Sequence, residues 1–342
     1  ALYAPALFLA GLPYAQHLSA LSLTLMAWLA LPTLAPERDE APRPLRLILL
    51  GLCLGAGCLV RPSMLSLVPV FGLWLLIRLY TLRDRPGRGP LFMGGILLFV
   101  TAAAVIIPAQ VHNHRLGAGM VISTNNERNF FLGNNPYTPD YKTSHLGQRT
   151  IDQLPPETAQ YLQSFYRQPD ARSAMTREAL RFIRENPLRT LVRTWNRGLS
   201  FWGFDYLGAR LIQEHYRLGK RGLFGLLAVE AGSYLTVVTL ALLSLFALRR
   251  RLAFTGAALL LSLTLGYQLP YLLAFSGGTY HYPVLPLLLP LAGGMVAALF
   301  DPAERAEALA RLRQSWPGVA LGLFGFAILQ AQYAYHALRL AA

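Results

Sequence analysis

Nine apolar segments recur along the chain, and most are separated only by short polar connections. Most are close to the roughly 20 residues that a helix needs to cross the hydrocarbon core of a bilayer, and the first, which is shorter, is expected to be incomplete. They cover approximately residues 1–12, 18–34, 45–60, 62–82, 91–111, 223–248, 252–275, 283–300 and 316–338. Hydrophobic residues make up 54% of the 342 residues and charged residues only 14%, which excludes an ordinary soluble protein. The sequence therefore predicts an all-α integral membrane protein, built as a multi-spanning helical bundle.

Arginines in the connections predict how the spans are oriented. The connections 35–46, 78–90, 249–251 and 301–315 together hold 13 arginines, whereas the short connections on the opposite side hold one, Arg61. Because cytoplasmic loops collect Lys and Arg, we place these four connections in the cytoplasm and residues 112–222 outside. This predicts three parts: residues 1–111 with about five spans, an extracytoplasmic and mainly helical segment 112–222, and residues 223–342 with about four spans.

The net charge of +14 raises the possibility of nucleic acid binding. The basic residues, however, stand in short clusters between apolar segments. Anionic lipid headgroups attract such clusters beside a span. A lipid bilayer therefore explains the charge better, and we expect no nucleic acid partner.

The long outer segment opens with a polar stretch at residues 123–140, STNNERNFFLGNNPYTPD, directly after an apolar segment. Asparagine offers donors and acceptors without charge, and Gly and Pro allow tight turns, so this stretch is suited to hydroxyl-rich ligands. The candidate substrate contacts are Asn125, Asn129, Asn134 and Asn135. The alternative is an ordinary loop whose Asn, Gly and Pro residues are turn formers.

Two helices are predicted further along the outer segment. Residues 170–185 place Met175, Ala179, Phe182 and Ile183 on one face, and Pro187 ends this helix. In the next stretch Leu188, Leu191, Val192, Trp195, Leu199 and Trp202 recur at helical spacing beside a stripe of Arg189, Arg193 and Arg197. This pattern indicates a helix at the membrane surface with its arginines facing away from the lipid. The alternative is a helix that caps the bundle.

Two positions on the predicted outer side are candidates for binding a phosphate. Arg61 lies between two apolar segments, where a guanidinium can pair with a lipid phosphate or simply reach the interface as a helix-end residue. His281 lies in the turn SGGTYHYPVLP with Tyr280 and Tyr282, which can contact a headgroup or sugar. An aromatic belt at the interface also explains the two tyrosines.

Other chemistry is poorly supported by the sequence. His112 and His114 form an H-x-H pair without a third ligand nearby, so we expect no metal site. Glu230, early in a span, is expected near the outer interface beside Lys220 or Arg221. The sequence contains no P-loop, nucleophile elbow or zinc-protease motif, and we expect no cofactor.

Five segments in order resemble the multi-spanning GT-C glycosyltransferases of the protein-mannosyltransferase and aminoarabinose-transferase type (family 39, RgtA-like), over nearly the whole chain. ALYAPALFLAGLPYAQHLSALSLTL is similar to their early span pair, LGLCLGAGCLVRPSML to their Arg-Pro junction and TNNERNFFLGNNP to their outer motif. EALRFIRENPLRTL resembles their helix that ends at a proline, and TYHYPVLPLLLPLAGG their late aromatic or basic turn. The resemblance implies a GT-C-like bundle.

The sequence departs from this family in three places. Gln16 and His17 stand where relatives commonly carry a glutamate, and Tyr280, His281 and Tyr282 replace a turn that is often richer in arginine. The family's catalytic carboxylate lies in the first outer loop, which we expect upstream of Ala1, so the chain is expected to be N-terminally truncated and its catalytic residue is unknown.

The resemblance implies transfer of a sugar, with inversion, from a polyprenyl-phosphate donor to an extracytoplasmic lipid, glycan or protein. Arg61 and His281 would bind the donor phosphate, and the four asparagines with Tyr280 and Tyr282 would bind substrate. The expected location is the bacterial inner membrane. Two other functions remain open, a transporter or flippase of lipid-linked sugars and a noncatalytic membrane subunit.

Overall fold

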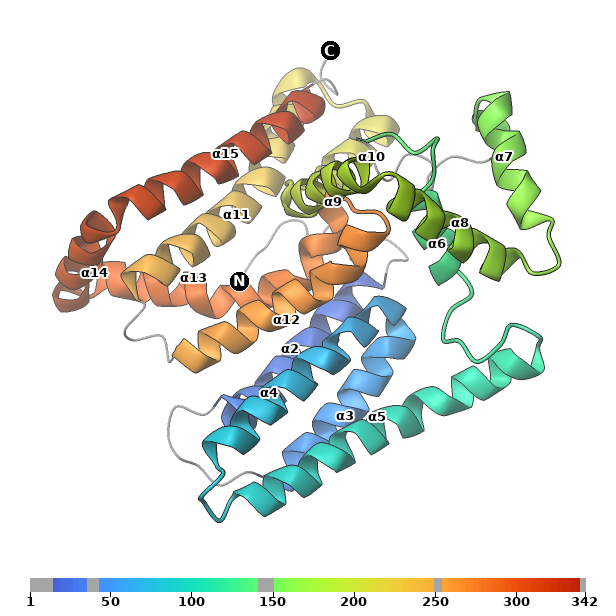
Figure 1. Cartoon of the computed structure of the whole chain (residues 1–342). Coiled ribbons are helices and arrows are strands. Elements are labelled where there is room, and N and C mark those ends of the chain that lie inside the picture. The colour runs from blue at the N-terminus through green and yellow to red at the C-terminus, as the bar shows by residue number, and fades with distance from the viewer. Residues whose placement is uncertain (1–14, 36–42, 141–150, 249–253, 339–342) are drawn as a thin grey trace. The chain divides into compact units, whose positions relative to one another are not determined.

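The computed structural model describes residues 15–35, 43–140, 151–248 and 254–338 (Figure 1). Helices account for 84% of the structure, and its described residues contain no strand, which confirms the all-α prediction. The elements are α2 (Gln16–Leu34), α3 (Pro44–Val60), η1 (Pro62–Ser66), α4 (Leu67–Thr81), α5 (Arg88–Arg115), α6 (Asn126–Gly133), η2 (Ile151–Gln153), α7 (Pro156–Tyr166), α8 (Ala171–Glu185), α9 (Pro187–Trp202), α10 (Leu207–Tyr216), α11 (Lys220–Ala247), α12 (Phe254–Leu273), η3 (Gly278–Val284), α13 (Leu285–Phe300), α14 (Pro302–Gln314) and α15 (Trp316–Leu338).

Seven helical segments in the described residues are long and apolar enough to cross a membrane, as expected for an integral membrane protein. They are Gln16–Leu34, Pro62–Thr81, Arg88–Arg115, Lys220–Ala247, Gly256–Leu273, Gly278–Phe300 and Trp316–Tyr335. An eighth predicted span, residues 45–60, corresponds to α3, an apolar helix of 17 residues. The ninth, residues 1–12, lies outside the described residues.

The chain divides into two compact units. The first takes its residues from Ala1–Pro108, Gly203–Tyr267 and His281–Ala342, and the second from Ala109–Trp202 with Gln268–Tyr280. The second unit thus ends at Trp202, before residue 222 where the sequence placed the boundary of the outer segment, and it also includes the last turns of α12. Because Gly203–Tyr267 groups with the first unit, α10 belongs with the spanning helices.

Within the first unit, α2 packs on α3 and α13, and α11 packs on α13 and α15. Glycines let α3 approach α5 closely, since a Cβ at Gly51 would lie 2.0 Å from Thr101 Oγ1 and 2.2 Å from the Leu98 carbonyl oxygen. Gly55, one turn later, faces Val105 and the Ala102 carbonyl in the same way. Small residues four apart are a common contact between helices in lipid, where backbones gain by close packing.

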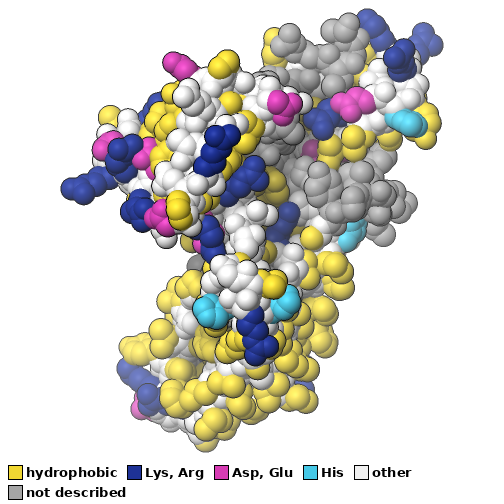
Figure 2. Space-filling view, turned by 90° about the vertical axis from the view of Figure 1, so that its right-hand side faces the viewer, with side chains coloured by type: hydrophobic (Ala, Val, Ile, Leu, Met, Phe, Trp, Pro, Cys, Tyr) yellow, Lys and Arg dark blue, Asp and Glu magenta, His cyan; other side chains and the backbone are white. Residues whose placement is uncertain are grey.

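The other faces of these helices carry exposed hydrophobic side chains. On α5, Phe92, Met93 and Val100 are each more than half exposed. Where the spanning helices come into view in Figure 2, hydrophobic side chains cover the surface and charged ones are few. Such a surface is suited to lipid and not to water.

The arginine-bearing connection 301–315 forms a helix, α14, that the sequence analysis did not predict. Asp301 caps it by accepting hydrogen bonds from the Ala303 and Glu304 amides, at 2.9 and 3.5 Å. Ala308 packs into a cluster with Ala247 and Leu248 after α11 and with Met295 and Ala298 of α13. This helix therefore covers the ends of α11 and α13.

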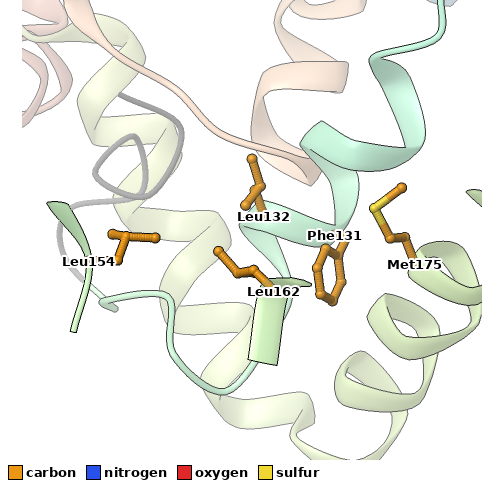
Figure 3. Packing of buried hydrophobic residues seen from close by; sticks show 5 residues of the cluster. All are labelled: Phe131, Leu132, Leu154, Leu162 and Met175. Carbon is orange, nitrogen blue, oxygen red and sulfur yellow. The ribbon is translucent and has the colours of Figure 1, made fainter. Parts of the chain in front are cut away.

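A small core holds part of the second unit together. Phe131 and Leu132 of α6 meet Leu154, Leu162 of α7 and Met175 of α8 (Figure 3). The predicted helix 170–185 is α8, which ends at Glu185, so the stop before Pro187 is confirmed. Of the predicted face, Met175, Ala179 and Phe182 are buried and Ile183 is half-buried. This core fixes α6 on α8, and with α6 it positions the rest of the polar stretch 123–140.

The close approach of α3 to α5 gives a first testable expectation. Gly51→Ala should lower the free energy of unfolding by about 1–3 kcal/mol, because the new methyl group meets backbone and must push the two helices apart. Thermal unfolding in detergent measures this. Gly225→Ala on α11 is the matched control, since nothing lies within 4 Å of its added Cβ. Equal stability of the two variants would contradict the close contact.

Candidate functional site

Arg61 stands at a break in the chain between α3 and η1. The residue before a proline avoids the helical conformation, and Arg61 is extended, with φ −149° and ψ 107°. Its guanidinium Nη1 donates to Gln16 Oε1 at 2.6 Å and to the Tyr267 hydroxyl at 3.2 Å. Arg61 therefore joins the start of α2 to α12.

His281 and Tyr282 reach the start of α2 from another direction. The Tyr282 ring lies 5.1 Å from that of His17, the residue after Gln16. His281 is 1% exposed, and its ring stacks on Tyr234 of α11 with 4.3 Å between centroids. Gln16 and His17 thus connect the segment of Arg61 with the segment of His281.

We call Gln16, His17, Arg61, Tyr267, His281 and Tyr282 the polar cluster. All six belong to the first unit. They lie near the beginning of α2, the end of α3, the end of α12 and the turn before α13. The alternation of arginine-rich and arginine-poor connections assigns all of these helix ends to the same side of the membrane. Tyr280 is not part of this cluster, because it belongs to the second unit, where its ring stacks on Tyr271 at 4.8 Å.

Asn134 and Asn135, predicted as ligand contacts, are fully buried. Asn134 Nδ2 donates to the carbonyls of Phe130 and Leu273, at 2.9 and 2.7 Å. Asn135 Nδ2 donates to the Phe131 carbonyl at 2.9 Å, and its Oδ1 accepts from the Tyr137 and Thr138 amides. In this structure both side chains shape the loop itself.

Two buried arginines of α9 hold this loop in place. Arg193 donates to the carbonyls of Asn135 and Thr138 and to Asp140 Oδ1, and its guanidinium lies 4.6 Å from the Phe182 ring. Arg197 donates to the carbonyls of Gly133, Leu272 and Leu273. The sequence analysis placed these arginines on the face away from the lipid and did not predict that they are buried, but both are 0% exposed. The carbonyls at the ends of α6 and α12 need donors, and the arginines supply them.

Burial and charge shift the pKa values of this group of residues. Desolvation, and then the nearby charge of Arg193, lowers the pKa of Arg197 to about 10, so it remains protonated at neutral pH. Desolvation also lowers the pKa of Arg193, against the influence of Asp140. Desolvation favours a raised pKa for Asp140, but the hydrogen bonds from Arg189 and Arg193 outweigh it and the net shift is downward.

Asn125 and Asn129 differ from the other two asparagines. Asn125 is exposed at the start of α6 and Asn129 is half-buried one turn later. Neither side-chain amide has a hydrogen-bond partner among the described residues. Of the four predicted contacts, these two are available to a ligand.

The second unit also contains a cavity of about 580 Å³. Its lining includes the glycine-bearing turn 117–119, Glu127 of α6 and the first turns of α8 from Asp170 to Arg177. Arg172 bridges the Ala118 carbonyl and Glu127 Oε1, while Glu127 Oε2 and Arg172 Nε are buried with no partner among the described residues. The sequence analysis did not predict this pocket, because the packing of α6 on α8 is not visible in the sequence.

Glu230 has different partners from those expected. It is 2% exposed and accepts from the amides of Gly208 and Ala209, at 3.1 and 2.9 Å. It therefore caps the first turn of α10, and the expected pairing with Lys220 or Arg221 is wrong. Within the part of the chain that the structure describes, no group of three or more His, Cys, Asp or Glu side chains is placed to hold a metal ion.

Comparisons with protein-family models, with curated proteins and with solved structures give no match. A functional assignment therefore depends on the residues and their geometry. The polar cluster is the strongest candidate for a functional site, because it brings the ionisable side chains of Arg61 and His281 into a bundle of mainly apolar helices.

Asp140 gives a prediction about stability and pH. Asp140→Asn should lower the free energy of unfolding of the second unit by about 1–2 kcal/mol at pH 7, since the buried Arg193 loses a charged acceptor and keeps two carbonyls. Because the folded state holds the Asp140 pKa low, the stabilisation is present above the unfolded pKa of about 3.9 and disappears as the pH falls through the folded value. Hydrogen exchange of the backbone amides at 133–140 measures this stabilisation, at pH 7 and again as the pH is lowered through the folded pKa of Asp140.

Asp170→Asn is the matched control for this experiment. Asp170 also pairs with an arginine, at 2.7 Å from Arg177, but both side chains are more than half exposed. Exposed pairs contribute little to stability. A loss in Asp170→Asn as large as in Asp140→Asn would contradict a special role for the buried Arg193.

Proposed function

We propose that this protein is a membrane glycosyltransferase that moves a sugar from a polyprenyl-phosphate donor to an acceptor outside the cytoplasm. The observation that carries the proposal is the polar cluster, in which Arg61 is hydrogen bonded to Gln16 and the ring of Tyr282, the residue after His281, lies against that of His17. Ionisable residues among spanning helices are costly and rare, and they commonly mark a functional site. The five segments that resemble GT-C glycosyltransferases include Gln16, His17, Arg61 and His281.

The cluster has the chemistry that a donor phosphate needs. Arg61 offers a planar fork of N–H donors that suits phosphate oxygens, and His281 can add a further N–H. The tyrosine rings of the cluster provide apolar faces beside these polar groups. A donor whose polyprenyl chain lies in lipid would present its phosphate at the ends of the spans, which is where the cluster is.

In the proposed reaction the acceptor oxygen or nitrogen attacks the anomeric carbon of the donor sugar. The new bond to the acceptor forms as the bond from that carbon to the phosphate oxygen breaks, which inverts the configuration. The acceptor proton passes to a carboxylate, and polyprenyl phosphate leaves with the electron pair. Arg61 and His281 stabilise the charge that develops on the phosphate, which is usually a large part of the catalytic effect. In the family that the sequence resembles, this carboxylate lies in the first outer loop.

The second unit supplies candidate contacts for the acceptor. Asn125 and Asn129 have amides available, and the same unit contains the pocket lined by Glu127 and the first turns of α8. These groups all lie in residues 117–177. An acceptor that carries hydroxyl or amino groups is suited to them.

The phosphate role of Arg61 gives the test of function. In the full-length protein, including any residues before Ala1, Arg61→Ala should reduce sugar transfer from a polyprenyl-phosphate donor by about 10²–10³-fold, as loss of one transition-state donor does in other enzymes. Arg61→Lys keeps the positive charge but not the planar fork of N–H donors, so its rate of sugar transfer should lie between those of the wild type and Arg61→Ala. Transfer is measured by release of polyprenyl phosphate and labelling of the acceptor in proteoliposomes.

Arg83→Ala is the matched control, because Arg83 is exposed and pairs only weakly with its neighbour Asp84. It should leave transfer unchanged. If wild-type protein translocates the intact lipid-linked sugar without cleaving it, the protein is a flippase and the proposal is wrong. If transfer occurs and Arg61→Ala retains full turnover, the donor phosphate is bound elsewhere.

A further inference from the structure

Helix α9 exposes four of its apolar residues and buries two of its three arginines. The side chains of Leu188, Leu191, Val192 and Trp195 are 78%, 66%, 51% and 68% exposed. These positions are spaced i, i+3, i+4 and i+7, so they form one continuous stripe. Arg193 and Arg197, on another face, are 0% exposed. A surface helix of a soluble protein has the opposite arrangement, with its apolar stripe on the core.

This arrangement favours one of the two alternatives that the sequence left open for the helix, namely a helix at the membrane surface. A helix that caps a bundle would bury the leucines and Trp195. Instead the buried side of α9 carries Arg193, which donates to the Asn135 carbonyl in the loop after α6, and Arg197, which donates to the carbonyls of Gly133, Leu272 and Leu273. The apolar stripe is therefore available for a partner outside the chain's own core.

The second half of α9 is fixed to the end of a membrane-spanning helix. Arg197 donates to the carbonyls of Leu272 and Leu273, at 3.0 and 3.1 Å, and Trp202 Nε1 donates to Gln268 Oε1 at 3.3 Å. These acceptors are the last residues of the span Gly256–Leu273. They lie in the same compact unit as α9. Helix α9 is therefore anchored at the level where this span leaves the hydrocarbon core.

We propose that α9 is a membrane-surface helix whose exposed stripe of Leu188, Leu191, Val192 and Trp195 inserts among the lipid headgroups and upper acyl chains. Its anchor on the last residues of α12 places the helix beside the end of a span. Trp is favoured at the boundary between headgroups and hydrocarbon. Residues 112–222 carry 16 Lys and Arg against nine Asp and Glu, which favours a surface of anionic lipid.

The test measures how deeply the stripe lies in lipid. Cys53 and Cys58 are replaced by alanine, and a nitroxide label is attached to the cysteine of Leu191→Cys. The labelled protein is reconstituted in vesicles of phosphatidylglycerol and phosphatidylethanolamine. Collision rates with oxygen, which concentrates in lipid, and with a water-soluble nickel complex are compared. Arg184→Cys on α8 is the matched control at an exposed polar position. We expect high oxygen and low nickel accessibility at 191, and the reverse at 184.

Each other result overturns the proposal. Nickel accessibility at 191 equal to that at 184 means that the stripe faces water. Low accessibility to both reagents means that protein, such as a second copy of the chain, covers it. Both labelled positions are surface residues. A second measurement needs no label and checks the same insertion through Trp195. The fluorescence that wild-type protein has in excess of Trp195→Phe should be quenched by lipids brominated near the headgroup, and unquenched excess fluorescence would contradict insertion.

Discussion

The second unit depends on two buried guanidinium groups. Arg193 and Arg197 lie on one face of α9 and donate to carbonyls at the end of α6, in the loop to Asp140 and at the end of α12. Helix ends leave carbonyl oxygens without partners, and a buried end without donors is costly. A buried arginine is costly too, but several acceptors compensate for it. The cost of the unpaired carbonyls and the cost of burying the guanidinium groups are both removed only when these segments lie together. The two arginines therefore specify how α9, α6 and α12 meet.

The same constraint determines the surface of α9. Once its arginines point inward, the leucines and Trp195 must point outward, and a soluble environment would penalise that surface. Arg197 also fixes the helix to the end of α12. The inward charge and the outward apolar stripe are therefore two results of one arrangement, and both are consistent with a helix that lies against a bilayer.

The first unit solves a different problem, which is how to place polar groups in an apolar bundle. Arg61 stands where Pro62 interrupts the helical chain, His281 stands in a short 3₁₀ turn before α13, and Gln16 begins α2. Each of these positions is a helix end. Polar side chains at helix ends can meet one another, while the middles of the helices remain apolar. The helices pack there through contacts such as that of Gly51 in α3 with α5. The proposed donor site thus needs no polar residue in the middle of a span.

The sequence by itself determined the helical class, the positions of the seven helices long enough to span a membrane and of the shorter apolar helix α3, α8 with its buried face, and the break at Arg61. It could do so because apolar segment length, helical periodicity and proline act locally. It also selected Arg61 and His281, though not their connection through Gln16 and His17. Only the tertiary structure decided that Asn134 and Asn135 are buried, that Glu230 caps α10, and that α6 and α8 enclose a cavity. It also decided which face of α9 turns inward. Periodicity shows that a helix has two faces, but the choice between them depends on which distant carbonyls need a donor, and only the folded chain brings those groups together.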